Sequence, residues 1–117
     1  MDIDLFLTNT GRLSRQAFWI CHIVLVVTYL LILFLLDDVL DYRSYYHNDK
    51  FASFAVMAVM TIPSINLGIK RFHDLGKTGW WVLIGFVPII GGLWYLIEAG
   101  FLPGAKGPNQ YGPDPLS

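Results

Sequence analysis

Residues able to do chemistry are concentrated in the stretch 70–79, which contains three cations, a His-Asp pair and two glycines. Positive side chains, glycine-rich backbone and the start of a following helix together suit a phosphate group. The sequence therefore allows a clamp for an anionic lipid headgroup or a polyprenyl phosphate. The candidate binding residues are Arg12, Arg15, Lys70, Arg71, His73, Asp74 and Lys77.

The same residues have a simpler interpretation, which the sequence favours over the clamp. Lys and Arg in short loops set the orientation of membrane helices, glycines permit tight turns, and tryptophans lie at the headgroup level. In this interpretation the cations are topology signals, and Trp19, Trp80 and Trp81 are interfacial anchors.

His73 and Asp74 invite comparison with an acid–base pair, because histidine titrates near neutrality and a carboxylate can fix its tautomer. Two adjacent residues do not by themselves form a catalytic site. We expect Asp74 to hold its loop through Arg71 or backbone amides, and we expect no catalytic residue, no metal site and no cofactor. The single Cys21 allows neither an intramolecular disulfide nor a Cys-Cys metal motif.

Two polar residues lie well inside apolar runs, where such groups usually face other helices. His22 and Asn66 each lie within about two turns of the same end of the expected bundle. The sequence predicts that they meet as a hydrogen-bonded pair. The alternative is that they form the floor of a small polar cleft beneath the basic loops.

Glu98 is the carboxylate within the third apolar run, where ionisable groups are costly. On a straight helix it lies about 27 Å from Trp80, which predicts a position near the opposite interface. A site shared with His73 would require the chain to turn back at Pro88 or Gly91-Gly92.

The elements that position these residues are three apolar runs, each long enough to cross about 30 Å of hydrocarbon as a helix of about 20 residues. Ser14 is the expected N-cap of the first, and Pro63 predicts a kink in the second. The third is either one kinked span or two half-length pieces, and we favour one span. The predicted spans cover about 15–36, 51–69 and 80–102, followed by an irregular Pro/Gly-rich tail at 103–117.

The sequence therefore predicts an all-α fold, with residues 1–117 forming a single transmembrane domain of three helices. The first run exceeds the roughly 7 to 15 residues of a signal-peptide core and ends in two aspartates, which predicts an uncleaved anchor. The net charge of −1 supplies no basic field for nucleic acid, so we expect no nucleic-acid partner.

Basic residues also predict orientation, because they are enriched in cytoplasmic loops. Five lie on the side of the amino terminus and three on the other, which predicts a cytoplasmic amino terminus and a periplasmic carboxyl terminus. The acidic, tyrosine-rich link 37–50 is expected at the periplasmic interface. The two groups are Arg12, Arg15, Lys70, Arg71 and Lys77 against Arg43, Lys50 and Lys106.

Three motifs occur in order along the chain. Residues 11–19 read Gly-Arg-Leu-Ser-Arg-Gln-Ala-Phe-Trp, residues 71–81 read Arg-Phe-His-Asp-Leu-Gly-Lys-Thr-Gly-Trp-Trp, and residues 103–115 read Pro-Gly-Ala-Lys-Gly-Pro-Asn-Gln-Tyr-Gly-Pro-Asp-Pro. This pattern resembles the bacterial inner-membrane family known as domain of unknown function eight hundred and five. Lys70 and Thr78 depart from the family's common Arg and Ser. The resemblance covers almost the whole chain and implies a membrane location but no activity.

We expect a non-enzymatic component of the bacterial inner (plasma) membrane that binds anionic lipid headgroups or other membrane proteins, including copies of itself. One alternative is a lipid-phosphate-processing enzyme that uses His73 and Asp74. Another is a homo-oligomeric channel or transporter subunit, for which Thr61, Ser64 and Asn66 would supply a polar stripe on the second span.

Overall fold

The computed structural model describes residues 3–39 and 51–116, and every regular element in this part of the chain is a helix. The predicted all-α class is confirmed. In chain order the elements are α1 (Asp4–Leu7), α2 (Arg15–Phe34), the π-helical turn η1 (Leu35–Val39), α4 (Phe51–Asp74), the 3-10 helix η2 (Gly79–Phe86), α5 (Ile90–Tyr95) and the π-helical η3 (Leu96–Phe101).

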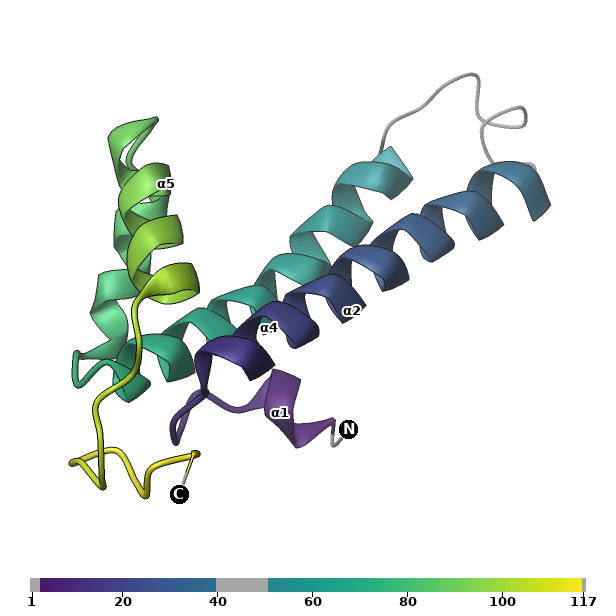
Figure 1. Ribbon diagram of the computed structural model, residues 1–117. Coiled ribbons are helices and arrows are strands. Elements are labelled where there is room, and N and C mark those ends of the chain that lie inside the picture. The colour runs from purple at the N-terminus through teal and green to yellow at the C-terminus, as the bar shows by residue number, and fades with distance from the viewer. Residues whose placement is uncertain (1–2, 40–50, 117) are drawn as a thin grey trace.

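Two long helices form one arm of the molecule, with α2 packed along α4 (Figure 1). The stretches Arg15–Asp38 and Phe51–Asp74 are each 24 residues long and apolar enough to cross a membrane, with a length of about 36 Å. Only 6% and 11% of their most apolar windows is buried in the protein. Apolar helices this exposed need a covering that the chain itself does not supply, which a bilayer provides.

The ends of these helices follow local sequence signals. As predicted, the Ser14 side chain accepts a hydrogen bond from the Ala17 N–H at 3.3 Å, capping α2. At the other end α4 finishes in a Schellman turn, in which Gly76 has φ of 80° and the Lys77 N–H donates to the Phe72 carbonyl at 2.8 Å. Residues 70–74 are thus the last turn of α4, and the prediction that they belong to a loop is wrong.

The third apolar run is a hairpin. The helix η2 leads away from the base of α4, the chain reverses over residues 87–89, and α5 with η3 returns along η2 (Figure 1). Each arm is about 16 to 18 Å long, roughly half of the hydrocarbon thickness. The prediction of one kinked span at 80–102 is therefore wrong, and the alternative of two half-length pieces holds.

The carboxyl-terminal tail is irregular, as predicted, apart from an isolated bridge between Asn109 and Gly112. Because the hairpin returns the chain to its starting level, the tail passes beneath the base of α2 and α4, close to the amino-terminal segment (Figure 1). The described residues at the two ends of the chain, 3 and 116, therefore lie at the same end of the bundle, whereas the sequence predicted termini on opposite sides. Residues 40–50 of the tyrosine-rich link, with Arg43 and Lys50, lie outside the described residues.

The buried core lies where α2, α4 and η3 meet. It consists of Leu13, Phe18, Cys21, Leu67 and Ala99. Cys21 is 1% exposed, in agreement with its expected role as a small packing residue. The core thus lies near the base of the bundle rather than along the length of the long helices.

The hairpin depends on the close approach of its two arms at Gly91. A Cβ atom added there would lie 2.0 Å from the Ile84 carbonyl oxygen, whereas one added at Gly92 would meet nothing within 4 Å. We expect Gly91→Ala to destabilise the protein by on the order of 1 to 3 kcal/mol, the usual range for overpacking.

The matched control is Gly92→Ala, one residue away in the same helix. The measurement is the midpoint of thermal unfolding in detergent micelles. Equal midpoints for the two variants would show that the arms do not meet as described.

Candidate functional site

The centre of the site is the side chain of Arg71, which is 0% exposed near the carboxyl end of α4. Its Nε donates to the Ala99 carbonyl at 2.7 Å and its Nη1 to the Leu13 carbonyl at 3.2 Å, while Nη2 donates to the Leu102 carbonyl. One guanidinium therefore joins α4, the segment before α2 and the end of the hairpin.

The end of η3 shows why so many donors gather here. The last carbonyls of a helix have no partner within the helix, and in a bilayer each unpaired group is costly. Arg71 donates to the carbonyls of residues 99 and 102. Trp19 Nε1 donates to carbonyl 100 at 2.7 Å, and Arg15 Nη1 donates to carbonyl 101 at 2.8 Å. The cations also complement the negative end of the helix dipole.

Asp74 balances part of this charge. Its carboxylate lies 2.5 Å from Arg71 Nη1 and 2.9 Å from Arg12 Nη2, and all three side chains are at most 3% exposed. The prediction that Asp74 acts through Arg71 is confirmed. Two buried guanidinium groups around one carboxylate leave a formal excess of one positive charge, which the surrounding carbonyl oxygens offset.

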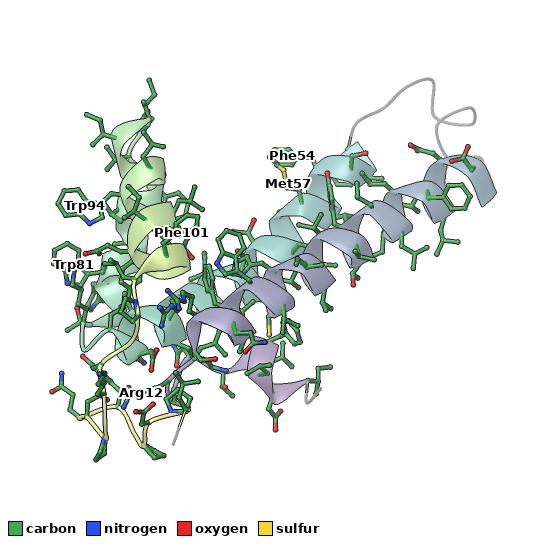
Figure 2. All side chains as sticks on the ribbon, viewed as in Figure 1. Arg12, Phe54, Met57, Trp81, Trp94 and Phe101 are labelled. Atoms are coloured by element: carbon green, nitrogen blue, oxygen red, sulfur yellow. The ribbon has the colours of Figure 1, made fainter. Side chains whose placement is uncertain are left out.

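Arg12 ties the tail to this centre. Its Nη2 donates to the Ala105 carbonyl at 2.5 Å and its Nη1 to the Gly107 carbonyl at 2.6 Å, at the base of the molecule (Figure 2). Within the tail, backbone N–H groups of Leu116 and Gly107 lower the pKa of Asp114 below its ordinary value. The tail thus has its own hydrogen-bonded turn in addition to its attachment to Arg12.

His73 is used in a structural contact. Its Nδ1 lies 2.9 Å from the Gly11 carbonyl oxygen, and its ring stacks on Tyr111 with centroids 4.0 Å apart and planes at 5°. Asn109 Nδ2 donates to the His73 carbonyl at 2.9 Å. Tyr111 and Asn109 were not among the predicted site residues, although both lie in the third motif.

Lys77 and Glu98 form an ion pair between the turn after α4 and the returning arm of the hairpin. The Lys77 Nζ also lies 4.7 Å from the centroid of the Trp81 ring. The prediction that Glu98 lies near the opposite interface is wrong, because it assumed a straight helix. The reversal after η2 brings Glu98 back to the level of the basic residues.

Two further predicted residues hold the short helix α1. Lys70 Nζ donates to the Leu5 carbonyl at 2.6 Å, and Asn66 Nδ2 donates to the Phe6 carbonyl at 2.9 Å. Asn66 therefore does not meet His22, contrary to prediction.

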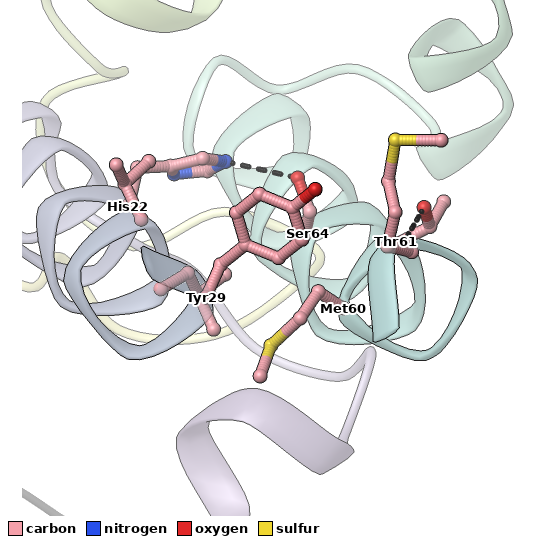
Figure 3. Close-up of a pocket in the computed structure, with 8 residues that line it drawn as sticks. His22, Tyr29, Met60, Thr61 and Ser64 are labelled. Carbon is pink, nitrogen blue, oxygen red and sulfur yellow. Dashed lines mark hydrogen bonds between the residues drawn. The ribbon is translucent and has the colours of Figure 1, made fainter. Parts of the chain in front are cut away.

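His22 pairs instead with Ser64 across α2 and α4. Its Nε2 lies 3.2 Å from Ser64 Oγ (Figure 3). Its Nδ1 lies 2.9 Å from the Phe18 carbonyl oxygen. Thr61 donates to the Met57 carbonyl at 2.9 Å within its own helix. A mainly apolar pocket of about 250 Å³ lies between the two helices. It is lined by His22, Leu25, Val26, Tyr29, Met57, Met60, Thr61 and Ser64.

The predicted phosphate-binding residues thus fall into two groups. Lys70 and Arg71 are buried, as is the side chain of Arg12, and their donors are directed to protein acceptors. Arg15 is exposed, and the Lys77 side chain is 32% exposed.

Within the described residues no group of three His, Cys, Asp or Glu side chains could hold a metal ion. The predicted anchors Trp19, Trp80 and Trp81 are 36%, 78% and 41% exposed.

Removal of the Asp74 charge tests the balance of the buried centre. We expect Asp74→Asn to leave two buried guanidinium groups without a counterion, at a cost of about 3 to 5 kcal/mol. Thermal unfolding in micelles measures the loss, with Asp38→Asn, an exposed aspartate near the far end of the long arm, as the control. A midpoint for Asp74→Asn no lower than that of the control would contradict this assignment.

The chain is similar in sequence to three proteins of Escherichia coli. The chain is 29% identical over 105 residues to "Inner membrane protein YhaH" of Escherichia coli (strain K12), covering 90% of this chain and 84% of that protein. It is 42% identical over 55 residues to "Inner membrane protein YhaI" of the same organism, covering 46% and 45%. It is 29% identical over 130 residues to "Uncharacterized protein YiiR", covering 89% and 83%. No solved structure matches.

The names of two relatives and the two long apolar helices agree with the predicted membrane location. The sequence also matches a family description over residues 6–113, a range that includes all three motifs. The chain belongs to the family described as "Protein of unknown function (DUF805)", as the sequence motifs predicted.

Proposed function

We propose that this protein is a non-enzymatic component of the bacterial inner membrane that binds anionic lipid headgroups at its basic end. The observation that carries the proposal is the segregation of charge. Every Lys and Arg in the described part of the chain lies at the end where α2 begins, α4 ends and the tail attaches. Such a cluster beside membrane helices attracts anionic lipids.

The basic cluster divides into buried residues, which we call the scaffold, and exposed or partly exposed residues, which we call the surface. Arg12 and Arg71 form the scaffold, because their side chains are buried and bonded to carbonyl oxygens. Arg15, Lys77 and Lys106 form the surface, since each is exposed or partly exposed. The proposed headgroup contacts are therefore these three residues, with the exposed Trp80 as an interfacial anchor.

An enzymatic role for His73 and Asp74 has less support. The Asp74 carboxylate is already shared by two guanidinium groups, and the His73 ring is stacked on Tyr111. Both residues therefore act in positioning the tail and hairpin.

The folded-back tail changes the expected orientation. With Lys106 moved to the side of the amino terminus, six basic residues lie at that end against Arg43 and Lys50 in the link. We infer that both termini are cytoplasmic. In a Cys21→Ala background, a membrane-impermeant maleimide should label Ser44→Cys in intact cells and should leave Asp2→Cys and Leu116→Cys unlabelled. Labelling of Leu116→Cys, with Ser44→Cys protected, would contradict the inferred orientation.

The headgroup proposal predicts a charge-dependent affinity. Arg15→Gln combined with Lys106→Gln should weaken retention of phosphatidylglycerol by about five-fold per charge, because each basic residue near the membrane surface contributes about 1 kcal/mol. Native mass spectrometry from micelles with titrated lipid gives the affinity. The charge-preserving pair Arg15→Lys with Lys106→Arg is the control. The proposal fails if the neutral and charged pairs retain the lipid equally.

A further inference from the structure

A groove on the outer side of the hairpin ends at a carboxylate. It has a volume of about 430 Å³, and five of its six lining residues are apolar or aromatic. Trp94 points away from the long helices, as does Trp81 (Figure 2). The lining residues are Ile90, Leu93, Trp94, Ile97, Glu98 and Leu102. The groove thus follows the returning arm from near the turn of the hairpin to its base.

Only one of the two carboxylate oxygens of Glu98 has a partner among the described residues. Its Oε1 is paired with Lys77 Nζ, whereas its Oε2 is buried and has no hydrogen-bond partner among the described residues. The side chain is 13% exposed. A buried carboxylate oxygen without a donor is costly, and such atoms are rare in native proteins unless a bound molecule supplies the donor.

The carboxylate lies at the level of the basic residues. Glu98 is less than one helical turn from Phe101, whose carbonyl receives the Arg15 guanidinium at the start of α2. Lys77 lies beside it and is itself partly exposed. A cation and a carboxylate therefore adjoin one another where the apolar groove meets the interface.

We propose that this groove binds a phospholipid with a primary ammonium headgroup. On binding, the Glu98 side chain would turn the buried Oε2 toward the groove to accept a hydrogen bond from the ammonium group. The phosphate would lie against Lys77, and an acyl chain would follow the apolar lining. A quaternary ammonium lacks N–H donors and cannot satisfy Oε2. A headgroup with no cation would bring its phosphate toward the carboxylate without compensation.

This inference rests on the proposed lipid-binding function but concerns a different contact. The basic surface recognises negative charge through Arg15 and Lys106, whereas Glu98 recognises an N–H donor with positive charge. The two can therefore fail separately. Loss of phosphatidylglycerol binding in the Arg15 and Lys106 variants tests the first, and discrimination between phosphatidylethanolamine and phosphatidylcholine tests the second.

The experiment offers the purified protein equal amounts of phosphatidylethanolamine and phosphatidylcholine with identical acyl chains, and counts each retained lipid by native mass spectrometry. We expect the wild-type protein to retain phosphatidylethanolamine about ten-fold more than phosphatidylcholine, since a hydrogen bond to a charged group supplies that discrimination. Glu98→Gln should abolish the preference. Asp38→Asn, a carboxylate far from the groove, should keep it.

A second variant covers the case in which Glu98→Gln fails to fold. Leu93→Trp fills the groove without touching the ion pair and should reduce retention of both lipids while the thermal midpoint stays within a few degrees of wild type. A wild-type protein that does not discriminate between the two lipids would overturn the proposal. So would a preference that survives in Glu98→Gln, because the donor to Oε2 would then be water or a protein group.

Discussion

The carboxyl end of η3 must find hydrogen-bond donors, and the rest of the base is arranged to supply them. A helix that ends at the base of the bundle leaves a row of carbonyl groups that its own backbone cannot satisfy. Arg71, Arg15 and Trp19 bind these carbonyls from two different helices. Asp74 then holds Arg71 and Arg12 together, and Arg12 extends the same arrangement to the tail. The three sequence motifs thus form one structural unit.

The hairpin and the two long helices differ in length. The helices α2 and α4 are long enough to cross it, while η2, α5 and η3 reach only about half as far. The reversal occurs at Pro88 and at Ile89, which adopts φ of 64°, a conformation that is unusual for a β-branched residue. The half-length arms expose apolar side chains such as Ile90 near the turn, and Glu98 on the returning arm pairs with Lys77 at the base of α4.

Much of the arrangement could be predicted from the sequence, because its signals are local. The apolar runs, the Ser14 cap and the irregular tail each depend on neighbouring residues, as does the pairing of Asp74 with Arg71 three positions earlier on the same helix. The role of Glu98 was predicted wrongly because distance along a straight helix was taken as distance in space. The sequence did contain a signal for the reversal in Pro88 and the paired glycines, but composition alone gave no reason to prefer it to a kink.

Contacts between residues far apart in the sequence could not be predicted from local sequence patterns. Tyr111 stacks on His73 and Asn109 bonds its carbonyl only because the hairpin brings the tail back to the base of α4. The cations were predicted to bind a ligand because each was considered without its acceptor in the protein. For Lys70 that acceptor is a carbonyl 65 residues earlier in the chain. Carbonyl groups at helix ends have no distinctive residue type, so a sequence pattern does not indicate them.

The most direct test of the central claim is a pair of spin-label distances measured by pulsed electron paramagnetic resonance in nanodiscs, in a Cys21→Ala background. One label is placed at Lys106→Cys in the tail, and the second at either Gln16→Cys or Asp38→Cys, at the two ends of the first long helix. A hairpin held at its base predicts that the tail label lies close to position 16 and about 33 Å or more from position 38. The reverse pattern, with the tail label near position 38, would show that the third run crosses the membrane and that Arg71 does not bind the end of a returning helix.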